Sequence, residues 1–173
     1  MIIDAHSHWL PQEIIDNAHF FSGAWGDIET HVAAMDKAGV DQVVLSYPTS
    51  DAHIHMGNYE KVVEIYNERV AAILKMRPDR FIGAAILPVD DEKKMLAEFK
   101  RATLELGFKA ISLATSFNGL FLDDARYMAL YKNAQKSGVP IFVHPQIIKP
   151  IGFSQVNDPL LTPVIEYVFE TTM

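Results

Sequence analysis

Apolar and polar residues follow two different patterns, which alternate along the chain. In the first pattern, short apolar runs have the length and composition of buried strands, and they stand at residues 1–8, 40–47, 80–87, 108–114 and 140–144. In the second, apolar residues recur every three or four positions over longer segments, which is typical of helices that bury one face. The sequence therefore predicts a regular alternation of strands and helices.

The expected helices have clear ends. They span residues 27–39, 58–76, 90–106 and 123–137. Either Asp90 or Asp91 is expected to cap the third helix and Asp123 the fourth, because a carboxylate accepts hydrogen bonds from the free N–H groups of a first turn. Glycine or proline follows each helix, as at a helix terminus.

Strands separated by helices of this length need crossover connections and form a parallel sheet that helices cover. The predicted fold class is therefore α/β. We find no linker, low-complexity tract or shift in composition, so residues 1–173 are expected to form a single domain.

Composition excludes several classes of protein. The net charge of −7 argues against nucleic-acid binding, which needs clustered Lys and Arg. No apolar run approaches the roughly 20 residues that cross a bilayer, and no secretory signal is recognised, so a cytoplasmic location without membrane contact is expected. The absence of cysteine leaves His, Asp and Glu as the expected metal donors.

Three histidines stand where strands end. His6 and His8 lie two residues apart on the first expected strand, so their side chains share one face. His144 ends the last expected strand. The carboxyl ends of parallel strands meet at one edge of the sheet, which is where such folds carry their functional groups. Three neutral imidazoles can hold a divalent ion and leave a coordination position open, so these histidines are the predicted metal ligands.

The order of several segments resembles a known family. Residues 3–11 (IDAHSHWLP), 35–41 (MDKAGVD), 67–70 (NERV) with 78–81 (PDRF), and 140–145 (PIFVHP) are similar to the amidohydrolase-related family that includes aminocarboxymuconate-semialdehyde decarboxylase and related aromatic-acid decarboxylases. The resemblance implies a TIM-type (β/α)₈ barrel with one divalent metal, usually zinc. It also implies that His6, His8 and His144 bind this metal, and that a further helix starts near Pro163.

The chain supplies only part of such a barrel. A complete barrel has eight strands and about 250 residues, whereas five strands are expected here, so the chain corresponds to the N-terminal portion of the family. The later-strand histidine and aspartate that the resemblance implies have no counterpart. A partial barrel exposes two sheet edges, which a homo-oligomer is expected to cover. The alternatives are an open five-stranded flavodoxin-like sheet, or a chain that is a fragment of a longer protein.

Other polar residues have weaker predicted roles. Asp4 shares the strand face of His6 and is expected to orient an imidazole from behind. Trp9 and Gln146 directly follow ligand positions and are predicted to contact the substrate. His53 and His55 repeat the two-residue spacing without a strand, so a solvated loop is the simpler interpretation. Surface positions are expected for His19 and His31.

Two functional hypotheses follow. In the first, the chain belongs to a metal-dependent enzyme that decarboxylates or hydrolyses a small carboxylated, often aromatic-derived, substrate. In the second, it is an inactive metal-binding remnant with a structural or partner-binding role.

Overall fold

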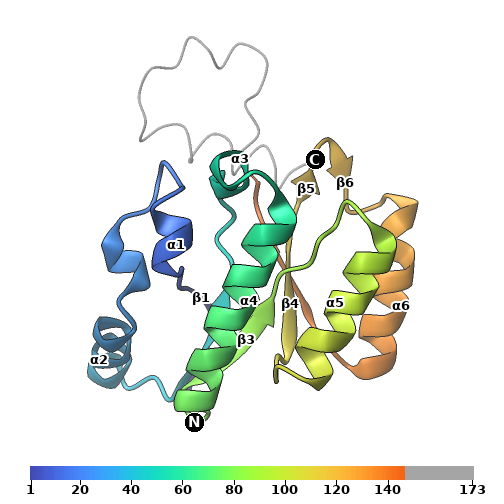
Figure 1. Ribbon diagram of the computed structural model, residues 1–173. Helices are drawn as coiled ribbons and strands as arrows, with labels where there is room; N and C mark the ends of the chain where they lie inside the picture. The colour runs from blue at the N-terminus through green and yellow to red at the C-terminus, as the bar shows by residue number, and fades with distance from the viewer. Residues whose placement is uncertain (147–173) are drawn as a thin grey trace.

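Five parallel strands form one sheet, and their order across the sheet repeats their order along the chain (Figure 1). The computed structural model describes residues 1–146. The sheet has the order β1-β2-β3-β4-β7, with β1 at Ile3–His8, β2 at Gln42–Ser46, β3 at Phe81–Ala85, β4 at Ala110–Ala114 and β7 at Ile141–His144.

The sequential strand order decides between the two expected architectures. A flavodoxin-like sheet places its strands in the order 2-1-3-4-5, whereas here each strand pairs in parallel with the next one along the chain. This is the order of a barrel wall. The partial (β/α) barrel is therefore confirmed as a half-barrel of five strands, and the open flavodoxin-like alternative is wrong.

Helices connect the strands and cover the outer face of the sheet (Figure 1). The α-helices are α1 (Gln12–Ile15), α2 (Ile28–Ala38), α3 (Ala52–Met56), α4 (Tyr59–Met76), α5 (Glu92–Leu104) and α6 (Met128–Ser137), with short 3₁₀ turns η1 (Gly23–Gly26) and η2 (Ala125–Tyr127). Across residues 1–146, no helix has both the length and the apolarity to span a bilayer. The helix expected from Pro163 lies outside the described residues.

The predicted helix ends are mostly confirmed. The carboxylates of Asp27 and Asp91 accept hydrogen bonds from the backbone N–H groups of Thr30 and Lys94, each at 3.0 Å. The fourth cap was assigned wrongly. Asp124, not Asp123, accepts from a first-turn N–H, because η2 precedes α6 and begins one residue later than expected.

A small hairpin follows β4 where only a loop was expected. It consists of β5 (Ser116–Phe117) and β6 (Leu120–Phe121), which pair antiparallel. Asn118 and Gly119 form its turn, with φ of +50° and +77°. Asn-Gly is the preferred pair for a two-residue turn that needs two positive φ angles.

The two faces of the sheet bury different side chains, because successive strand residues point to opposite sides. Outward residues such as Leu45, Phe81 and Ile111 join the large core under the helices. Inward residues form a separate and smaller cluster, in which Val44, Ala84 and Ala110 contact Ile82 and Phe142. The inner face thus buries far fewer apolar side chains than the outer face does.

Gly83 on β3 allows α4 to pack closely against this strand. A Cβ atom at this position would lie 2.7 Å from Phe108 Cδ1 and 2.8 Å from Leu74 Cδ1, and both of these atoms belong to packed side chains. A Cβ at Gly23 would meet nothing within 4 Å.

We therefore expect Gly83→Ala to lower the free energy of unfolding by about 1–3 kcal/mol, because overpacking forces neighbours out of their rotamers. Gly23→Ala is the matched control and should change it by less than about 1 kcal/mol. Urea unfolding followed by circular dichroism measures both. Equal effects of the two substitutions would contradict the close approach.

Candidate metal centre

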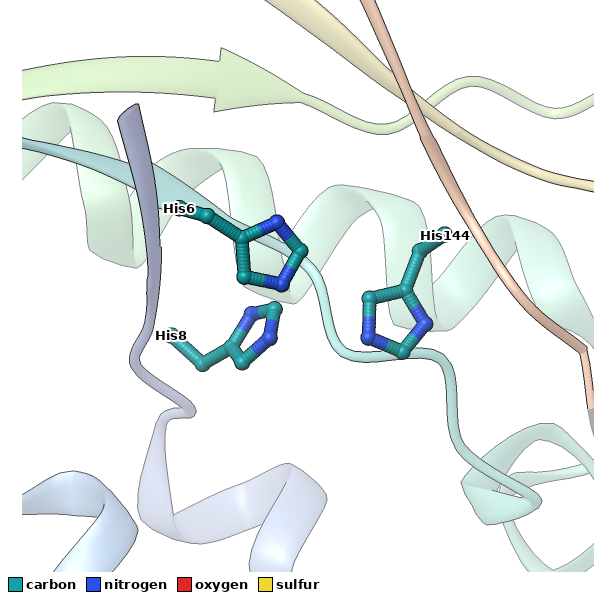
Figure 2. Close-up of side chains that lie close together, drawn as sticks. All are labelled: His6, His8 and His144. Carbon is teal, nitrogen blue, oxygen red and sulfur yellow. The ribbon is translucent and has the colours of Figure 1, made fainter. Parts of the chain in front are cut away.

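His6, His8 and His144 converge on one point at the carboxyl ends of β1 and β7 (Figure 2). The ring centroids lie 4.6 Å apart for His6 and His8, 5.7 Å for His6 and His144, and 5.0 Å for His8 and His144. One candidate ligand atom from each residue can be chosen so that all three lie within 4.8 Å of one another. The structure thus brings together the three side chains that the sequence singled out.

This convergence requires a curved sheet, because β1 and β7 are its two edge strands. Neighbouring strands lie about 4.8 Å apart, so the edges of a flat five-stranded sheet would be separated by about 19 Å. Imidazoles from the two edges meet only because the sheet bends around its inner face.

The backbone of β2 determines which nitrogen of His8 carries the proton. His8 Nδ1 lies 3.0 Å from the carbonyl oxygen of Ser46. A carbonyl only accepts hydrogen bonds, so Nδ1 must be the protonated nitrogen and Nε2 keeps the lone pair. The Ser46 hydroxyl lies 3.2 Å from the same Nδ1 and donates to the carbonyl of Ser7, which fixes β1 against β2 at this level.

His144 has the same protonation pattern. Its Nδ1 lies 3.0 Å from the carbonyl oxygen of Pro145, so that nitrogen donates and Nε2 again keeps the lone pair. A hydrogen bond of this kind from the far nitrogen is the usual companion of a metal-binding histidine, because it holds the ring and raises its basicity.

Burial keeps these rings neutral. Desolvation lowers the pKa of His8, partly opposed by its bond to the Ser46 carbonyl. Burial also lowers the pKa of His144 to about 4, with smaller contributions of the same sign from His8 and His6. Neutral imidazole is the form that binds a metal, so the site is prepared for an ion at neutral pH without first releasing protons.

The donor set fits a divalent transition metal. Three imidazoles with free lone pairs suit zinc and similar ions, and no other group of three such donors comes together among residues 1–146. His6 is exposed, while His144 is buried, so the cluster opens to solvent on the β1 side.

Asp4 acts on this site through the main chain. Its Oδ1 accepts a hydrogen bond of 3.0 Å from the backbone N–H of His6, rather than from an imidazole. This bond lies at the bulge of β1, where the pairing with β2 shifts between Asp4 and Ser7. The exposed carboxylate therefore stabilises the irregular backbone that carries His6.

Trp9 is packed into the core instead of lining an open pocket. It is buried, and its indole N–H donates to the carbonyl of Gly26 at 2.9 Å. The ring beside the metal ligands is that of Trp25, stacked on His8 with centroids 6.1 Å apart. Trp25 lies in the long connection between β1 and α2. No pattern in the sequence indicates that this connection returns to the site.

Gln146 lies next to the predicted site. Its backbone N–H donates to Thr115 Oγ1 at 3.0 Å. It also lines a small pocket at the ends of β2, β4 and β7, together with Tyr47, Thr49, Ser50, His53, Tyr59, Ala114 and Phe117. The substrate contact expected of Gln146 stays a prediction.

The second pair of histidines does not converge. His53 and His55 lie on α3, and residues two apart on a helix point to different sides. The His53 ring lies near Phe117, whereas the His55 ring lies 4.8 Å from that of His19. The same spacing that gathers ligands on β1 separates side chains on α3.

His31 is not the surface residue that we expected. It is half-buried on α2, and its Nε2 lies 2.9 Å from Ser7 Oγ. Burial lowers its pKa, while the charge of Asp4 acts in the opposite direction. Helical periodicity placed His31 on α2 but could not show that this face of the helix packs against β1.

Comparisons with known proteins agree with this geometry. The chain is 27% identical over 152 residues to 2-amino-3-carboxymuconate-6-semialdehyde decarboxylase of Dictyostelium discoideum, which covers 83% of this chain and 41% of the relative. Two solved structures share the fold. One is 5-carboxyvanillate decarboxylase of Sphingomonas paucimobilis, with a TM-score of 0.80 and 19% identity; the match covers 99% of this chain and 60% of that one. The other is dihydroxybenzoic acid decarboxylase of a Polaromonas species, with a TM-score of 0.71 and 24% identity; the match covers 98% of this chain and 58% of that one.

The Polaromonas enzyme was solved with bound manganese and the inhibitor 2-nitroresorcinol. This chain spans less than two thirds of the length of each of these three proteins. The family model of the amidohydrolases (Amidohydro_2) matches residues 3–167, which is nearly the whole chain. The chain therefore belongs to this amidohydrolase family.

Proposed function

We propose that this chain carries the metal-binding part of a metal-dependent decarboxylase that acts on a small aromatic carboxylate. The observation that carries the proposal is the convergence of His6, His8 and His144 from opposite edges of a half-barrel. The relatives support the proposed substrate class, because they are named as decarboxylases of carboxylated aromatic or aromatic-derived compounds. Hydrolysis, the other reaction considered from the sequence, is not named for any of these three relatives.

His6, His8 and His144 would hold one divalent ion, and we propose zinc because three neutral imidazoles suit its tetrahedral preference. When bound, the ion supplies a Lewis acid that polarises a substrate oxygen. The protein orients the imidazoles through the carbonyls of Ser46 and Pro145. Gln146 is proposed to contact the substrate from the β7 side, and Trp25 replaces Trp9 as the proposed aromatic contact.

The edges of the half-barrel support a further proposal on assembly. Ile2, Ile3 and Val143 are apolar and exposed at or beside the two edge strands. Covering them in a homo-oligomer would remove from solvent the two edges that have no partner among the strands of residues 1–146. The assembly and the cytoplasmic location both stay predictions.

Metal analysis tests the ligand set. We expect one zinc or manganese ion per chain after dialysis, and His6→Ala or His144→Ala should weaken binding more than roughly 100-fold, because even the hydrogen-bond partners of ligands are worth about 10–100-fold. His19→Ala is the control, since His19 is exposed and bonds Asp51 outside the cluster. Stoichiometric metal that persists in both ligand variants would overturn the assignment.

The stability of the metal-free chain should depend on His144. Its pKa is about 4 in the folded chain and 6.5 for an ordinary histidine. Below pH 6.5 the unfolded chain therefore binds more protons, so the free energy of unfolding should fall as the pH drops from about 6.5 towards 4. Urea unfolding in the presence of a chelator should show a smaller decrease for His144→Gln than for the wild type. Parallel pH profiles would contradict the burial of a neutral imidazole.

Product analysis tests the reaction itself. The metal-loaded chain is incubated with dihydroxybenzoate or 5-carboxyvanillate, and we expect chromatography to detect the product that lacks one carboxyl group. His6→Ala should lower the rate at least roughly 100-fold, as expected for the loss of a ligand. A metal-loaded wild type that releases no product from either compound would favour the alternative of a metal-binding chain without catalysis.

A further inference from the structure

Thr49 stands out because its backbone conformation is unusual for its side chain. It follows β2 with φ of +56°, in the left-handed region that β-branched residues rarely adopt. Its side chain is buried, with 7% of the residue exposed. Strain of this kind persists only where the surrounding structure holds it in place, and it clusters at functional sites.

The strained backbone delivers the Thr49 hydroxyl to the end of β7. Thr49 Oγ1 donates to the carbonyl of Pro145 at 3.2 Å, across 96 residues of sequence. The same carbonyl accepts from His144 Nδ1 at 3.0 Å. A carbonyl oxygen has two lone pairs, so both donors can be satisfied at once. Thr49 and His144 therefore share one acceptor.

The peptide group that carries this acceptor is held on both sides. Its N–H, which belongs to Gln146, donates to Thr115 Oγ1 from the end of β4. Its carbonyl is held by Thr49 from the loop after β2. Thr49 and Thr115, which follow β2 and β4, thus fix the plane of this peptide group. The His144 ring is oriented by its hydrogen bond to the same group.

We propose that Thr49 is a positioning residue for His144: its hydroxyl holds the Pro145 carbonyl in the orientation that keeps Nδ1 protonated and Nε2 available to a divalent ion. The proposal rests on the metal role of His144 proposed above. It adds a contact from the β2 loop, which provides no ligand of its own.

Thr49→Val tests the hydroxyl, because valine is β-branched and carries the same backbone strain while losing only the donor. In the metal-free chain at pH 8, the ¹⁵N resonances of the His144 imidazole report which nitrogen is protonated. We expect the wild type and Thr49→Ser to show the Nδ1–H form, and Thr49→Val to populate the Nε2–H form. Binding of zinc alone, measured by competition with a chelator, should weaken about 10-fold in Thr49→Val and recover in Thr49→Ser.

Thr103→Val is the matched control, because it removes a hydroxyl that bonds the Phe99 carbonyl on α5, away from the site. Should Thr49→Val fail to fold, Thr49→Gly removes the hydroxyl at a backbone angle that glycine adopts without strain. An unchanged ¹⁵N pattern and unchanged zinc affinity in the hydroxyl-free variant would overturn the role of Thr49. If the wild type itself binds no zinc, the proposed metal function fails, whereas the ¹⁵N pattern still decides whether Thr49 sets the tautomer.

Discussion

Curvature of one parallel sheet is the constraint on which the candidate site depends. The candidate ligands come from the first and the last of the five strands, so any flattening of the sheet would draw His144 away from His6 and His8. The outer face carries a continuous core of large side chains under the helices. The inner face carries small residues such as Ala84 and Ala110. Because side chains from the two edge strands meet, the sheet bends toward its inner face and the histidines lie on this concave side.

The main chain prepares the site as much as the ligands do. His8 and His144 each donate from Nδ1 to a backbone carbonyl, one on the neighbouring strand and one on the next residue. Burial then makes the charged imidazolium unfavourable at both positions. The fold thus sets the tautomer of these two candidate ligands and favours their neutral form.

The histidine cluster is exposed on one side because β1 lies at an edge of the sheet. β1 pairs only with β2 among the described strands, and most of its residues are exposed. His6 shares this exposure, whereas His144 is shielded by the connections that follow β2 and β4. The half-barrel therefore presents one well-enclosed ligand and one open ligand, with the space between them accessible from the β1 edge.

Much of the fold could be predicted from the sequence because its determinants are local. Apolar runs, helical periodicity and capping residues such as Asp27 and Asp91 depend on neighbours within a few positions. Asp123 was assigned as a cap in error because a 3₁₀ turn, η2, intervenes before α6. Trp25 escaped sequence reasoning for a different reason, since it reaches the site from a connection whose path local patterns do not encode.

The sequence by itself determined the order of strands and helices, the fold class and the three imidazoles able to form a site. Only the tertiary structure decided how closely the three rings approach one another and which ring nitrogens of His8 and His144 carry the proton. The spacing of His6 and His8 equals that of His53 and His55, yet one pair lies on a strand and the other on a helix. Convergence with His144 needed sheet curvature and strand register, which arise from contacts between residues far apart in the chain.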